Sequence, residues 1–121
     1  MFDAKTAIQY IEKCFPQLAS ELHDDVIDGL LHPQIGAFSH YAQRVIDESN
    51  RNEWDTITSS FVEIYNDCSQ DVLNAMNVSF LEHLNFKDEK HIRSWAYDTM
   101  PSVMKQAWIE MDAYNRKLHG G

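Results

Sequence analysis

The sequence predicts an all-α protein, a compact single-domain bundle of about six or seven helices. Apolar residues recur at spacings of three and four along most of the chain, which is typical of amphipathic helices. No segment alternates cleanly between apolar and polar residues, and no Asn-Gly or Asp-Gly turn joins two strand-like runs. The 121 residues suffice for one core, which the 12% of aromatic residues can fill.

Three helices are predicted in the first part of the chain. Asp3 can cap the first helix, and Phe15-Pro16 ends it because the residue before a proline disfavours the α region. Pro16 then fits the first turn of a second helix, which Gly29 closes. Pro33, in the connector 30–33, can start a third helix. The three apolar stripes are Ala7, Ile8, Ile11 and Cys14; Leu18, Leu22, Val26 and Ile27; and Ile35, Phe38, Tyr41, Ala42, Val45 and Ile46.

Four more helices are predicted after a break at residues 50–52. Asn52, Ser69 and Asp88 are candidate caps of the fourth, fifth and sixth helices, and Pro101 starts the last. The fourth and fifth together resemble one hairpin of a helical solenoid. One domain covers 1–121, and its Gly120-Gly121 tail should fray. The helical stripes are Trp54, Ile57, Phe61, Ile64 and Cys68; Val72, Leu73, Met76, Phe80, Leu81 and Leu84, which face inward; Ile92, Trp95 and Ala96; and Met104, Ala107, Trp108, Met111, Asn115 and Leu118.

The charge of the chain is strongly and unevenly acidic. The formal net charge is −9, and residues 1–71 hold 13 acidic and 4 basic residues, whereas residues 72–121 hold 6 of each. Such a chain lacks the basic face of a nucleic-acid binder, and an anionic membrane repels it. The excess acid is therefore either a solubility surface or a face that binds a basic partner.

Signals for a membrane or an oxidising compartment are absent from the sequence. Charged residues interrupt positions 1–15, so we expect no signal peptide there. The longest stretch without Asp, Glu, Lys or Arg, residues 29–43, is too polar to span a bilayer. Cys14 and Cys68 fall on apolar helix positions, where a buried free thiol is expected. These features predict a cytoplasmic protein.

The sequence offers little for catalysis or for a cofactor. His23-Asp24 matches the HD doublet of one class of metal phosphohydrolases, but no His-x-x-x-His, Glu-x-x-His or Cys-x-x-Cys spacing accompanies it. There is no Gly-x-Ser-x-Gly motif and no glycine-rich phosphate loop. We therefore expect no catalytic residue, no cofactor and no metal, and hence no enzyme; a metal enzyme using His23 and Asp24 is the least favoured alternative.

Two acidic patches are the candidate partner interface. Positions 21, 24, 25 and 28 share one face of the predicted second helix, where like charges repel unless a basic partner meets them. A second patch surrounds the connector between the third and fourth helices, where Trp54 is either an interface anchor or a staple at the helix end. The candidates are Glu21, Asp24, Asp25 and Asp28, and then Asp47, Glu48, Glu53, Trp54 and Asp55.

Several short motifs between Cys14 and Leu84 carry a family resemblance. They are Cys14-Phe15-Pro16, Gly36-Ala37-Phe38, Phe61 with Glu63-Ile64, Asp71-Val72 with Asn74-Ala75, and Val78-Ser79-Phe80-Leu81-Glu82-His83-Leu84, which is similar to a Phe-Leu-Glu-x-Leu helix ending. With these motifs the chain resembles a family of small bacterial all-helical proteins of unassigned activity. Ile64-Tyr65 replaces the family's Ile-Glu pair, and Cys68-Ser69 replaces a Gly before Asp-Glu. Members resemble the immunity proteins encoded beside polymorphic toxins.

That resemblance implies a cytoplasmic inhibitor that neutralises one secreted bacterial toxin domain. In this hypothesis the protein is a monomer when free, and its acidic surface binds a basic surface of the toxin. The alternative is a non-catalytic helical adaptor or scaffold whose acid serves solubility alone. A toxin gene beside the gene of this protein would favour the first hypothesis.

Overall fold

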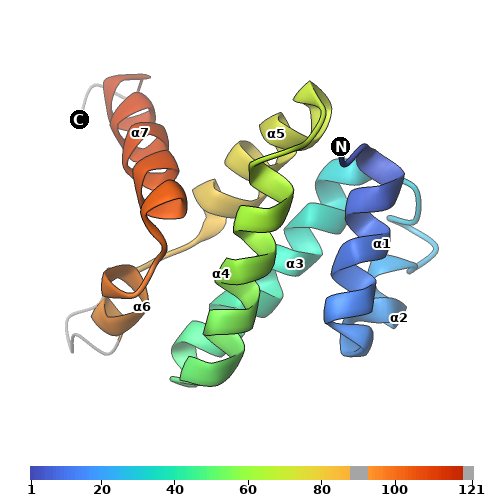
Figure 1. Ribbon diagram of the computed structural model, residues 1–121, viewed down its shortest axis with the longest axis horizontal. Coiled ribbons are helices and arrows are strands. Elements are labelled where there is room, and N and C mark those ends of the chain that lie inside the picture. Colours follow the sequence, from blue (N-terminus) through green and yellow to red (C-terminus); the bar gives the residue numbers. More distant parts are fainter. Residues whose placement is uncertain (88–92, 119–121) are drawn as a thin grey trace.

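The computed structural model describes residues 1–87 and 93–118, and this part of the chain forms a compact helical bundle (Figure 1). It contains no β-strand; one isolated parallel bridge joins Phe2 to Cys68. The predicted all-α fold class is therefore confirmed. The elements are α1 (Ala4–Cys14), η1 (Pro16–Leu18), α2 (Ala19–Leu22), α3 (Leu31–Asp47), α4 (Arg51–Tyr65), α5 (Gln70–Ala75), η2 (Met76–Phe80), η3 (Leu81–His83), α6 (Ser94–Asp98) and α7 (Ser102–Leu118).

The predicted caps Asp3 and Ser69 are confirmed by their contacts, whereas the predicted cap Asn52 is wrong. The Asp3 carboxylate accepts a hydrogen bond from the backbone N–H of Thr6, and α1 ends just before Phe15. Ser69 caps α5 by accepting from the N–H of Val72. The cap of α4 is Asn50 and not Asn52, because the Asn50 side chain accepts from the N–H three residues later.

The prediction of one helix from Pro16 to Gly29 is wrong. Pro16 opens a 3-10 turn, α2 ends at Leu22, and residues 24–29 form an irregular turn that ends at Gly29 with φ +80°. The Asp24 carboxylate accepts a hydrogen bond from the Val26 N–H at 3.0 Å. Such a side chain offers the backbone an alternative to the helix ladder. Val26, predicted to face the core, is 79% exposed.

The predicted fifth helix contains a π-helical turn, η2, in its second half. The Ser39 hydroxyl of α3 donates a hydrogen bond to the Phe80 carbonyl at 2.9 Å, which satisfies a backbone group at the end of this turn. His32, predicted in a connector, lies in the first turn of α3 and its Nδ1 is 2.7 Å from the Ser79 hydroxyl. The predicted cap Asp88 and the apolar position Ile92 lie outside the described residues, as do Gly120 and Gly121.

The core is centred on α3, which contacts α1, α2, α4, α5, η2 and η3. Phe38 on α3 stacks between Phe15 and Phe80, with ring centroids 5.4 and 4.8 Å away, and Phe80 meets Phe61 of α4 at 5.4 Å. All four rings are fully buried. The packing centre is therefore α3.

The C-terminal helices attach through a second group of rings. Trp108 of α7 packs edge-on against Phe86 at 5.5 Å and Tyr97 of α6 at 5.6 Å. Helices α6 and α7 lie at one end of the molecule, and α1 and α2 lie at the other (Figure 1). Among the described helices, none combines the length and the apolar character that crossing a membrane requires. Cys14 and Cys68 are free thiols and half-buried.

Candidate partner-binding surface

The four carboxylates of the first predicted patch do not share one helical face, because α2 ends before three of them. Glu21 lies 3.4 Å from Nη2 of Arg44 on α3, Asp28 lies 2.8 Å from Nδ1 of His23, and Asp24 caps its own turn. Asp25 is exposed and its side chain makes no hydrogen bond or ion pair within residues 1–87 and 93–118. Only Asp25 is therefore entirely available to a partner.

The His23 side chain connects helix α1 to the turn that carries these acids, and we call this contact the His23 clamp. Its Nε2 lies 2.7 Å from Oε1 of Glu12, and its Nδ1 lies 2.8 Å from Oδ1 of Asp28. The hydrogen bonds to Asp28 and then Glu12 raise the pKa of the His23 imidazole above its usual value. Within the described residues no group of three or more His, Cys, Asp or Glu side chains could hold a metal ion. Both residues of the HD doublet therefore stabilise the turn. His23 does so through its contacts with Glu12 and Asp28, and Asp24 through its hydrogen bond from the Val26 N–H.

The His23 clamp makes the stability of the protein depend on pH. Because the folded pKa is raised, the clamp contributes fully below the ordinary histidine pKa of 6.5 and is lost as the pH rises through the folded pKa. We expect the thermal midpoint of the wild type to exceed that of His23→Gln at about pH 6, with a difference that shrinks toward about pH 9. A Glu12→Gln/Asp28→Asn variant should lose this pH dependence. If the difference in thermal midpoint between the wild type and His23→Gln stayed constant over this pH range, the clamp would be contradicted.

The second patch is divided between two faces of the molecule. Glu53, in the first turn of α4, accepts hydrogen bonds from the Tyr41 hydroxyl and from Nε2 of Gln17. Arg44 lies over the Tyr41 ring, 5.6 Å from its centroid, and pairs with Glu21. Burial and the bond to Glu53 raise the pKa of the Tyr41 phenol. Tyr41 and Arg44 thus join Glu21 of the first patch to Glu53 of the second.

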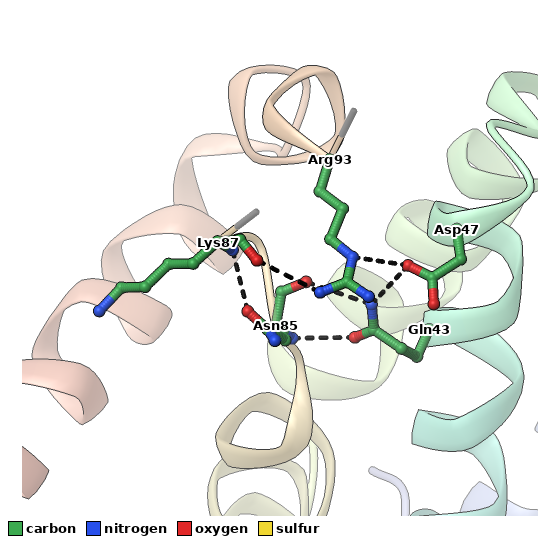
Figure 2. Close-up of polar contacts among 5 residues, drawn as sticks. All are labelled: Gln43, Asp47, Asn85, Lys87 and Arg93. Carbon is green, nitrogen blue, oxygen red and sulfur yellow. Dashed lines mark hydrogen bonds and ion pairs between the residues drawn. The ribbon is translucent and has the colours of Figure 1, made fainter. Parts of the chain in front are cut away.

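Asp47 points toward the segment that follows η3 and toward Arg93 (Figure 2). Its Oδ1 lies 2.7 Å from Nε of Arg93 and accepts a hydrogen bond from Gln43 at 3.1 Å. Gln43 also pairs with the backbone of Asn85, accepting from its N–H at 2.8 Å and donating to its carbonyl at 3.1 Å. Arg93 in turn donates to the Lys87 carbonyl at 3.2 Å. Asp47 therefore holds this segment against α3.

Removing the Asp47 carboxylate should loosen that segment and leave the rest of the bundle intact. We expect Asp47→Ala to lower the free energy of unfolding by about 1 kcal/mol, since the ion pair is partly exposed. Amide hydrogen exchange in residues 84–87 and 94–98 should become faster than in the wild type. Glu48→Ala is the matched control, because that exposed side chain has no partner in the described chain. Equal exchange in both variants would contradict this role.

Trp54 is not an interface anchor in the folded protein. Its side chain is 0% exposed, and its indole N–H donates a hydrogen bond to the Ala96 carbonyl of α6 at 3.1 Å. The rings of Phe86 and Trp95 pack edge-on against it. The alternative interpretation, a staple at the helix end, is confirmed. Asp55, the next residue, is exposed on the same face of α4 as Arg51, which lies over the Trp95 ring.

The acidic surface that results consists of carboxylates around a single arginine. Tyr41, Arg44 and Glu48 follow one another at spacings of three and four, so they lie on one face of α3 and its cap. Sequence reasoning missed Gln17, Tyr41 and Arg44, because an apolar stripe and isolated polar residues give no sign of a long-range contact. We define the acidic surface as Glu21, Glu48 and Glu53, which lie around Arg44 and Tyr41, together with Asp24 and Asp25 in the turn that follows Glu21 along the chain.

Comparison with known families covers nearly the whole chain. Residues 8–116 match the family described as "Domain of unknown function (DUF7674)". The chain belongs to the DUF7674 family. No curated protein and no solved structure matches this DUF7674 chain. The family therefore has no assigned function, and nothing in the match links it to immunity proteins or to the Phe-Leu-Glu-x-Leu pattern.

Proposed function

We propose that this DUF7674 protein is a non-enzymatic immunity protein that binds and neutralises one toxin domain. The acidic surface makes the contact, and the toxin domain presents a basic surface to it. The observation that carries the proposal is that Arg44 and Tyr41 join Glu21 and Glu53, 32 positions apart in the chain, on one surface. The resemblance to immunity proteins supplies the class of partner.

The geometry of the acidic surface suits an electrostatic encounter. Glu21 and Glu53 are fixed by contacts, so they hold their positions before binding and lose little side-chain freedom on binding. Asp25 and Glu48 remain exposed and are not neutralised within the described chain. Carboxylates gathered on one face attract a basic partner and raise its association rate by about 10 to 10³-fold at low ionic strength.

The solubility hypothesis remains the alternative, because exposed carboxylates also keep a protein dispersed. In that case the protein is a helical adaptor, and the position of the acids on the surface has no bearing on binding. The two hypotheses differ in what the acids do when a basic partner is supplied. Only an inhibitor of the proposed kind should form a stoichiometric complex with the toxin domain that weakens when the acidic surface is neutralised.

Co-expression tests the proposal directly. The C-terminal domain of the protein encoded by the neighbouring gene is produced in cells with and without the full chain. We expect growth to be restored by the chain, and the two purified proteins to form a complex by size-exclusion chromatography. A toxic domain whose effect is unchanged and which forms no complex would contradict the proposal and favour the adaptor.

A further inference from the structure

Helix α7 carries an apolar stripe that the core does not fully cover. Val103, Ala107, Met111, Tyr114 and Leu118 follow one another at spacings of four, four, three and four, so they share one face of the helix. The outer members are exposed, with Tyr114 at 62% and Leu118 at 61%. An apolar face that a folded chain leaves open marks an interaction site more often than isolated exposed residues do.

This stripe forms one wall of a groove. The other wall comes from Val78 on η2 and Glu82 on η3, with Tyr65 at the end of α4. The groove continues past Ala107 to Val103 near the start of α7. From Val103 to Leu118 it runs about 23 Å at 1.5 Å per residue, which matches a partner helix of about four turns.

The charge of the groove favours one sign of partner. Glu82 and Glu110 stand on opposite walls, and no Lys, Arg or His is among the described residues that line it. Glu110 accepts a hydrogen bond from Gln106 at 3.0 Å and remains exposed. Apolar residues between two carboxylates are complementary to a helix with a leucine-type stripe flanked by Lys or Arg.

We propose that this groove binds a cationic amphipathic helix of a partner protein. It lies along α7, at the opposite end of the molecule from α1 and α2 (Figure 1), and shares no residue with the acidic surface, so it is a second docking surface. A second copy of this chain is a poor occupant, because each copy carries a formal charge of −9 and brings its own groove carboxylates.

A model peptide tests the groove. The probe is a fluorescein-labelled peptide of about 16 leucine and lysine residues, with leucines at helical spacing, and its control has the same composition in scrambled order. We expect fluorescence anisotropy to show saturable binding of the first peptide only. Tyr114→Ser/Leu118→Ser should weaken binding by about tenfold or more, because two apolar contacts are lost.

Matched variants separate the groove from the overall acidity. Val26→Ser/Leu30→Ser also replaces two exposed apolar side chains by serine, but outside the groove, and should stay within about twofold of the wild type. Glu82→Gln/Glu110→Gln should weaken binding by roughly fivefold at low salt, and Asp25→Asn/Glu48→Gln, which removes as much charge, should weaken it less.

Three results would overturn the proposal. The first is equal binding of the scrambled peptide, and the second is equal affinity of the wild type and Tyr114→Ser/Leu118→Ser. Both would mean that the peptide responds to net charge alone. The third is a wild-type dimer in sedimentation velocity that becomes a monomer in the Tyr114→Ser/Leu118→Ser variant, because the groove would then bind a second copy of the chain.

Discussion

Replacing Trp54 by alanine is expected to lower the free energy of unfolding by about 3–5 kcal/mol. The side chain is fully buried, and its removal opens a cavity between α4 and α6 where Phe86 and Trp95 pack on it. The Ala96 carbonyl also loses the hydrogen bond from the indole N–H. Domains of this size are stable by about 5–15 kcal/mol, so this loss is a large share of the total stability and should shift the unfolding midpoint clearly.

Urea denaturation followed by circular dichroism measures the effect of Trp54→Ala. Trp54→Phe keeps much of the ring but not the N–H donor, and it should lose less stability than the alanine variant. Tyr114→Ala truncates an exposed aromatic side chain and should stay within about 0.5 kcal/mol of the wild type. If Trp54→Ala were as stable as Tyr114→Ala, the ring would not staple α4 to α6.

The helices could be predicted because their signals are local. Phe15-Pro16 ends α1 through sterics that depend on two neighbouring residues, and Ser69 caps α5 through a contact three residues away. The prediction failed at α2, where the apolar spacing of Leu22 and Val26 suggested one helix. Asp24 instead bonds the backbone of its own turn, and spacing alone does not show that competition.

The candidate site could be predicted only as a set of acidic residues. Whether a carboxylate is free depends on partners that are distant in the chain: Asp47 meets Arg93 at a separation of 46 residues, and Glu21 meets Arg44 at a separation of 23. Trp54 shows the same limit, since flanking acids suggested exposure while α6 covers the ring. The composition determines how many acidic residues are in excess, whereas the tertiary structure determines which of them form ion pairs.

Replacing Asp25 and Glu48 by lysine, which reverses their charge, is the most direct test of the acidic surface. Both are exposed and have no side-chain partner among the described residues, whereas reversing Asp24, Asp28 or Asp47 would also break a cap or an ion pair. We expect Asp25→Lys/Glu48→Lys to fold with an unchanged thermal midpoint. Its association rate with the toxin domain should fall by about tenfold at low salt, while the dissociation rate changes less.

Surface plasmon resonance at several salt concentrations measures both rates, and the difference from the wild type should narrow as salt screens the charges. Glu63→Lys/Asp98→Lys is the control, because it changes the formal charge equally at exposed residues outside the acidic surface. If the control slows association as much, net charge and not a defined face steers the encounter. If neither variant slows association, the acidic residues serve solubility. An acidic face that attracts a basic partner would attract it less once its two exposed carboxylates were replaced by lysines.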